Sequence, residues 1–207
     1  MDGTKRSGTI PQMKIIGFSG PNGSGKDTVA DMLGAQHNFY VASATQMLTQ
    51  ELEQRGWPTD REHKSKLSAE WRREYGMAVI VDRAYEYYKQ HQDKYAGMIV
   101  GSLRHPGEAD RVHELGGTML WIDADPRVRY DRIQANAAVR GRAAEDDKTY
   151  EEFLAEQERE MRPVGDEATL NMSAVKGRAD AFLENNGDDL EEFKAAVKKQ
   201  LAHLLNK

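Results

Sequence analysis

The most distinctive run of residues in this sequence is GPNGSGKDT, at positions 20–28. Its glycines lack the side chains that would keep the backbone away from a ligand, so successive N–H groups can surround phosphate oxygens. Lys26 adds a positive charge for the β and γ phosphates of a nucleotide. The run therefore predicts a P-loop that binds ATP. The predicted nucleotide-binding residues in it are Gly20, Asn22, Gly23, Ser24, Gly25, Lys26, Asp27 and Thr28.

The last two residues of this run are candidates for a magnesium site. A P-loop usually has a serine or threonine directly after the lysine as a magnesium ligand, but here Asp27 holds that place and Thr28 follows. Thr28 could contact the α phosphate, while Asp27 reaches the metal directly or the metal is held through water. Equally, Asp27 could be an acid that the helix dipole favours in the first turn. We predict Mg²⁺ as a cofactor, with Asp27 and Thr28 as its candidate ligands.

Arginines could neutralise the charge that builds up when a phosphoryl group passes between two polyanions. Arg104 is the leading candidate for both catalysis and acceptor binding, because it should follow the carboxyl end of a strand and its planar fork suits a phosphate. Arg72 and His105 are further candidates for contacting the acceptor. A solvated helix face would explain Arg72 nearly as well, and a turn before a proline explains His105 better.

Three more arginines flank or lie within a predicted lid over residues 136–148. Arg132, Arg140 and Arg142 could close over the phosphates, exclude water and stabilise the transferring group. An ordinary charged loop would account for Arg140 and Arg142 equally well. Asn185 is a further candidate for nucleotide binding, although a turn also favours asparagine.

The elements that must position these residues alternate between strands and helices. Residues 13–19 form a short apolar run without alternation, which is typical of a parallel strand covered on both faces, and the helix that begins at Lys26 follows the P-loop. Further strands are expected at 39–42, 95–101, 118–122 and 179–183. The pattern predicts an α/β fold, a P-loop three-layer sandwich with a central parallel sheet, whose ligands bind outside the carboxyl ends of the strands.

Three helices in the second half have recognisable starts. Asp125 and the following proline should open a helix that ends near residue 136, with Arg129 on its solvated side. Capping-box spacings start the other two: one helix runs from Thr149 to about residue 162, and the last from Asp188 to about residue 205.

Two segments are expected to lie outside the three layers of the sandwich. Residues 43–92 are helical and charged, with a break at 56–58 between two helices, and we predict a helical acceptor-binding insertion there. The short lid at 136–148 is the second. Residues 1–12 are expected to be a disordered tail, and residues 13–207 a single kinase domain.

Composition excludes several classes of function. A net charge of -5 argues against a general nucleic-acid surface, which needs a basic face. The sequence has no cysteine, which excludes disulfides and thiolate zinc sites and fits a cytoplasmic protein. No apolar run approaches the roughly 20 residues that cross a bilayer, so no membrane partner is expected. We expect a small-molecule nucleotide acceptor as partner and either a monomer or a homodimer.

Taken together, the motifs resemble a known group of kinases. The pair GxxGSGKDT and VGSLRHPGEA, the latter at positions 100–109, resembles phage-type deoxynucleoside monophosphate kinases. The segments at 72–77, 122–133 and 179–193 are similar to archaeal adenylate-kinase-like proteins and dephospho-CoA kinases. The matches cover nearly the whole chain after residue 12. The resemblance implies ATP-dependent phosphoryl transfer to a nucleoside or deoxynucleoside monophosphate.

The sequence also departs from these families. Gly101 or Ser102 stands where such kinases often place an aspartate near magnesium, and Thr49 where adenylate-kinase-like enzymes have an arginine. A dephospho-CoA kinase-like enzyme is the nearest alternative, but residues 41–46 lack the aspartate that would act as its general base. A non-catalytic nucleotide switch or weak ATPase is the alternative from another class.

Overall fold

The computed structural model of this protein describes residues 14–137 and 146–205. The predicted tail at 1–12, most of the predicted lid, and the lid residues Arg140 and Arg142 lie outside the described residues. In the described part of the chain, no helix is both long enough and apolar enough to span a bilayer.

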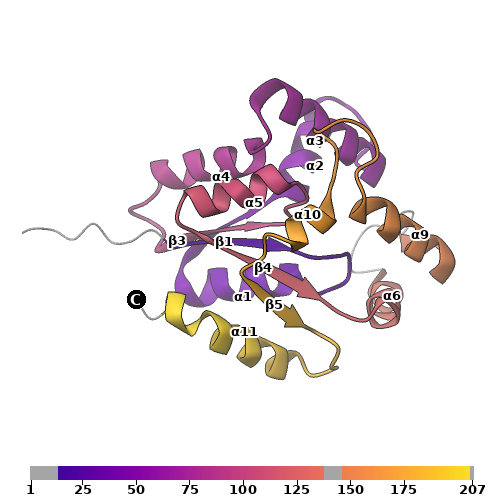
Figure 1. The fold of residues 1–207 in the computed structure, drawn as a ribbon. Helices are drawn as coiled ribbons and strands as arrows, with labels where there is room; N and C mark the ends of the chain where they lie inside the picture. Colours follow the sequence, from indigo (N-terminus) through magenta and orange to yellow (C-terminus); the bar gives the residue numbers. More distant parts are fainter. Residues whose placement is uncertain (1–13, 138–145, 206–207) are drawn as a thin grey trace, which may run out of the picture.

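Five parallel strands form a central sheet in the order β2-β3-β1-β4-β5 (Figure 1). This order places β1, and therefore the P-loop that follows it, in the middle of the sheet. The strands are β1 (Lys14–Ser19), β2 (Phe39–Ser43), β3 (Gly97–Gly101), β4 (Thr118–Asp123) and β5 (Ala181–Glu184). The predicted α/β fold with a central parallel sheet is confirmed.

Helices cover both faces of this sheet, as Figure 1 shows. One face carries α1 (Lys26–His37) and α11 (Leu190–Leu205), drawn below the sheet. The other carries α4 (Val79–Gln90), α5 (Pro106–Glu114) and α10 (Met172–Lys176), drawn above it. The helix α10 was not predicted from the sequence. The three layers account for the runs of successive apolar residues within the strands, because both faces of the sheet are covered.

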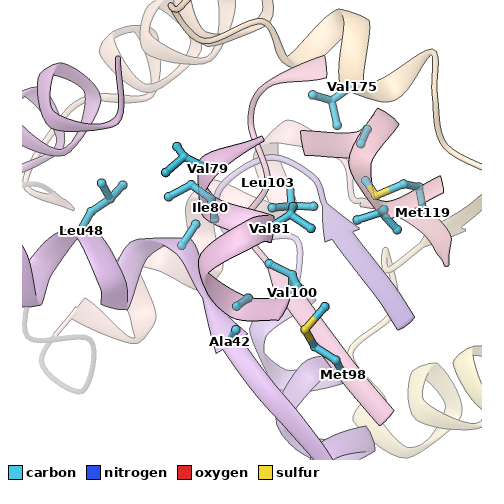
Figure 2. Packing of buried hydrophobic residues seen from close by; sticks show 14 of the residues in the cluster. Ala42, Leu48, Val79, Ile80, Val81, Met98, Val100, Leu103, Met119 and Val175 are labelled. Atoms are coloured by element: carbon cyan, nitrogen blue, oxygen red, sulfur yellow. The ribbon is translucent and has the colours of Figure 1, made fainter. Parts of the chain in front are cut away.

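Alternate residues of β1, β2, β3 and β4 enter two separate cores. On β3, Met98 and Val100 pack with the α4 and α5 side, where Figure 2 shows them beside Val81 and Leu103. Ile99, between them, packs with the α1 and α11 side instead. This two-residue period is that of an extended strand. It determines which face of the sheet each side chain at the end of a strand points to.

The segment 43–92 contains three helices instead of the predicted two. Two of them, α2 (Ala44–Gln54) and α3 (Arg61–Tyr75), lie together at the upper right of Figure 1. Gly76 then ends α3 with a φ of 101°, a conformation that favours glycine, and α4 follows. Because α4 packs against β3 and α5, it belongs to the sandwich. Of the predicted helical insertion, only α2 and α3 therefore lie outside the sandwich.

Two further helices lie beyond the carboxyl ends of the strands, at the right of Figure 1. These are α6 (Pro126–Ala135) and α9 (Tyr150–Met161), and α9 begins with the predicted Thr149 capping box. For α11, however, the cap is Asp189 and not Asp188, since Asp189 accepts hydrogen bonds from the N–H groups of residues 191 and 192. The helix begins at residue 190, so Asp189 directly precedes it.

Candidate active site

The loop between β1 and α1 has the features of a phosphate cradle. Gly25 has a φ of 93°, and a Cβ there would lie 2.5 Å from Asn185 Nδ2, so no side chain fits. The Ser24 hydroxyl is buried and has no hydrogen-bond partner among the described residues. Because the loop ends at the N-terminus of α1, the helix dipole also favours an anion here. These observations fit the predicted binding of nucleotide phosphates.

Lys26 follows the loop and is 5% exposed. Its Nζ donates to the Pro21 carbonyl oxygen at 3.4 Å. Burial lowers the pKa of Lys26 to about 8; the charge of Asp27 opposes this shift, and that of Arg104 adds to it. The ammonium is therefore charged at neutral pH but loses its proton within a range that can be measured.

Affinity for ATP should fall as pH rises through about 8. The reason is that deprotonated Lys26 no longer attracts phosphate, and at pH 9 about one tenth of the lysines stay charged, which implies a loss of up to about tenfold. Calorimetric titrations between pH 6.5 and 9.5 would measure this. The variant Lys26→Arg keeps its charge throughout that range and should show no such decline. An equal decline in both proteins would contradict the prediction.

Beside Lys26 lies a cavity, which we call the P-loop cavity, between the strand ends and α2, α3 and α9. Its apolar wall consists of Ala44, Leu48, Ile80 and Leu170. The cationic residues lining it are Lys26, Arg61, Lys64, Arg72 and Arg104. The acidic residues lining it are Asp27, Glu108 and Glu160. A site with a cationic floor and an apolar wall suits a small molecule that has an anionic group and an apolar or planar part.

Arg104 enters this cavity from the chain that follows β3. Its Nη1 lies 2.6 Å from Glu160 Oε1, and its backbone N–H donates to Glu108 at 2.8 Å. The P-loop lysine and the predicted acceptor arginine therefore line the same cavity. Ser102, where related kinases often have an aspartate, also lines it and has a φ of 63°. Such a φ is uncommon for a residue with a side chain and is found preferentially at functional sites.

Arg72 and His105 form hydrogen bonds that hold the wall of the cavity in position. Arg72 donates to Glu108 at 2.7 Å and to the Ala168 carbonyl at 3.0 Å, so its guanidinium is held within the cavity wall. His105 is not among the residues that line the cavity. Its Nδ1 accepts from the Gly107 N–H, which leaves Nε2 to donate to the residue 167 carbonyl at 2.7 Å. Burial lowers the pKa of His105, which fits this neutral form.

Both residues thus fasten the segment 162–171, which connects α9 to α10 and which we call the strap. The strap forms one side of the P-loop cavity through Leu170. The backbone N–H of Asn171 also donates to the Arg104 carbonyl at 3.0 Å. Arg72 and His105 therefore position the wall of the cavity through these hydrogen bonds, and the contact of either residue with a substrate stays a prediction.

Arg132 and Asn185 lie on the other side of the P-loop. Arg132 donates to the carbonyls of Asn185, at 2.7 Å, and of Gly187. Asn185 in turn donates from Nδ2 to the Ser24 carbonyl at 3.0 Å. Arg132 is not among the residues that line the P-loop cavity. In this structure it braces the turn after β5 against the P-loop, in place of the predicted position over the transferring group.

Arg129 is a site residue that the sequence did not reveal. The expectation of a solvated side chain is wrong, since Arg129 is 1% exposed. Its Nε donates to the Ala124 carbonyl at 2.8 Å, its Nη1 to the Asn22 carbonyl at 3.3 Å, and its Nη2 to Gln157 on α9. Burial lowers its pKa. The apolar Ile133, four residues later on the same face, was the available signal for burial.

Glu156 and Glu160 on α9 were also missed. Glu156 forms ion pairs with Arg61 and Lys148, and Glu160 pairs with Arg104. Because the sequence of α9 is charged on most of its surface, it resembles a solvated helix. Its contacts show instead that α9 pairs with Arg61 and Arg104, and that it lines the P-loop cavity with Glu160.

The residues around the P-loop include one side chain that could bind Mg²⁺. Asp27 lines the P-loop cavity, whereas Thr28 is exposed and is not among the lining residues. Within residues 14–137 and 146–205, no group of three or more His, Cys, Asp and Glu side chains could hold a metal. Mg²⁺ is commonly bound by one or two carboxylates together with substrate phosphates and water. Asp27 fits that mode beside a bound nucleotide.

Comparisons with known proteins agree with the fold. No curated protein matches the sequence. Among solved structures, TT1252 from Thermus thermophilus is 23% identical with a TM-score of 0.56, covering 93% of this chain and 98% of the other. Shikimate kinase from Bacteroides thetaiotaomicron is 14% identical with a TM-score of 0.51 and the same coverage. Shikimate kinase from Acinetobacter baumannii, in complex with shikimate, is 12% identical with a TM-score of 0.52, covering 93% and 96%.

These identities are low, so the likeness shows the fold and no more. The sequence itself matches a family model described as an AAA domain over residues 16–160, from β1 to α9. Because this match spans most of the chain, the protein belongs to that AAA domain family.

Proposed function

We propose that this protein transfers the γ phosphoryl group of ATP to a small anionic acceptor, in the first place a nucleoside or deoxynucleoside monophosphate. The observation that carries the proposal is that Lys26 and Arg104 line one cavity. Lys26 belongs to the phosphate cradle of the donor. Arg104 follows the carboxyl end of β3, the strand that pairs with β1. A phosphoryl group could pass between the two residues while their positive charges balance its negative charge.

The chemistry of such a transfer requires positioning and charge more than covalent participation. The P-loop amides and Lys26 would hold the donor phosphates, and Arg104 and Arg61 the acceptor phosphate. Bound Mg²⁺, with Asp27 as its protein ligand, would supply further neutralisation of the phosphate oxygens. A monophosphate is already an anionic nucleophile, so the cavity needs no group to remove a proton. Leu48 and Ile80 would pack against the base.

A hydroxyl acceptor is the second candidate. It needs a general base, and Asp27 places a carboxylate in the P-loop cavity, beside the donor site. Such a reaction would resemble that of a dephospho-CoA kinase.

A coupled assay distinguishes these candidates. ATP and Mg²⁺ are supplied with each common nucleoside and deoxynucleoside monophosphate, with dephospho-CoA and with shikimate. We expect turnover above background ATP hydrolysis with at least one monophosphate. Turnover with the hydroxyl compounds alone would support the second candidate. If no acceptor is phosphorylated while calorimetry shows magnesium-dependent ATP binding, the protein is a nucleotide switch or weak ATPase and the proposal fails.

A further inference from the structure

Glu160 is a buried carboxylate in the P-loop cavity that has no part in the transfer described above. It is 8% exposed. Its Oε1 lies 2.6 Å from Arg104 Nη1 and 3.6 Å from Arg61 Nε. Burial alone would raise the pKa of Glu160, but the charges of Arg104, Arg61 and Lys26 hold it at about 2. The carboxylate is therefore ionised at neutral pH, and it stands among three cations.

The contact between Glu160 and Arg104 differs from the other buried ion pair of this cavity. In that pair, Glu108 Oε1 accepts from Nε and Nη2 of Arg72, and Oε2 accepts the backbone N–H groups of Arg104 and His105. Glu160 Oε1, in contrast, has no aligned hydrogen bond among the described residues. The contact with Arg104 therefore rests mainly on charge. A buried charge with few hydrogen bonds is costly, so this pair is the one that a better ligand can replace.

The position of Glu160 on α9 allows such a replacement. It is the last residue but one of the helix, where the backbone is least constrained. One turn earlier, Glu156 pairs with Arg61 and Lys148 and is not among the residues that line the cavity. These pairs would keep α9 fastened to α3 while the Glu160 side chain turns away.

We propose that Glu160 occupies the place of an anionic group of the acceptor, and that acceptor binding replaces its carboxylate between Arg104 and Arg61. The inference rests on the proposed function, because it takes the P-loop cavity as the acceptor site. Replacement favours a group with more charge than the carboxylate that it displaces. A phosphate monoester carries about -1.5 to -2 at pH 7, whereas a carboxylic acid carries one charge. Glu160 therefore sets the strength of binding that an acceptor must exceed, and a phosphate-bearing acceptor meets this requirement more readily than a carboxylate does.

Calorimetric titration with inorganic phosphate tests this without turnover. The P-loop is first filled with a non-hydrolysable ATP analogue and Mg²⁺, so that the added phosphate reports on the acceptor side. Glu160→Gln removes the competing charge and should bind phosphate about tenfold more tightly than the wild type. Glu158→Gln is the matched control, because it lies on the same helix but pairs with the exposed Arg162, and neither residue lines the cavity. Its phosphate affinity should stay within about twofold of the wild type.

Equal or weaker phosphate binding by Glu160→Gln would overturn the proposal and make Glu160 a positioning residue for the arginines. Competition by acetate provides a second measurement. A fault in folding would weaken the binding of phosphate and of acetate alike, whereas removal of the competing carboxylate should strengthen the binding of both. In the wild type itself, acetate should fail to displace phosphate even in large excess, and ready displacement would also overturn the proposal. Failure of the ATP analogue to bind would count against the proposed function alone.

Discussion

Lys26→Met should reduce phosphoryl transfer by about 10²–10³-fold, the loss typical when one group that stabilises a transition-state charge is removed. Lys26 is the cation at the P-loop, and it lines the cavity that Arg104 lines from the other side. Methionine keeps the length of the side chain and removes its charge. Steady-state kinetics with the acceptor found in the coupled assay would measure the loss as a fall in kcat.

The fold should survive this change. Burial lowers the pKa of Lys26 to about 8 from 10.5, so at neutral pH the charged lysine disfavours the folded state. The free energy of unfolding of Lys26→Met should therefore equal or exceed that of the wild type. Lys89→Met, on the exposed face of α4, is a control for loss of a lysine and should leave turnover unchanged. Normal turnover by Lys26→Met would refute the role assigned to this lysine.

Arg72→Ala should destabilise the protein by about 3–5 kcal/mol, the usual effect of removing one partner of a buried ion pair. The side chains of Arg72 and Glu108 are 2% and 1% exposed. Without Arg72, the Glu108 carboxylate stays buried without its counter-charge, and the Ala168 carbonyl on the strap loses a donor. Denaturant titration followed by circular dichroism would measure the change in the free energy of unfolding.

The neighbouring residue offers a close control. Arg73 also donates two hydrogen bonds to one carboxylate, that of Asp166, but both side chains are about half exposed. Water and salt screen such a pair, so Arg73→Ala should leave the unfolding transition close to that of the wild type. Similar losses of stability in the two variants would show that burial does not control the strength of these pairs.

The sheet and the P-loop could be predicted because their signals are local. The apolar run expected at 13–19 is β1 at Lys14–Ser19, since a strand covered on both faces needs apolar residues at successive positions. The glycines and lysine that follow it mark the loop in the same way. Gly76 was a local signal of a helix end that was missed within the helical pattern of 43–92.

The buried charged residues around the P-loop and its cavity could not be predicted in this way. Arg129 and Glu160 lie on helices with several charged residues, and a charged residue is ordinarily solvated. Their burial results from partners distant in the chain: the Asn22 carbonyl for Arg129, and Arg104 for Glu160. Arg72, expected to meet a ligand, meets Glu108 for the same reason. No single segment carries information about such pairs.

Helix α9 contacts both halves of the active site. Gln157 reaches the P-loop through Arg129, which donates to the Asn22 carbonyl, and Glu160 reaches Arg104. A shift of α9 that accompanies binding in one half would therefore change the other half, and the affinities for the two substrates become thermodynamically linked. Such linkage is reciprocal, so the factor by which ATP changes the affinity for the acceptor equals the factor by which the acceptor changes the affinity for ATP. Two ligands that share no contact would then bind cooperatively.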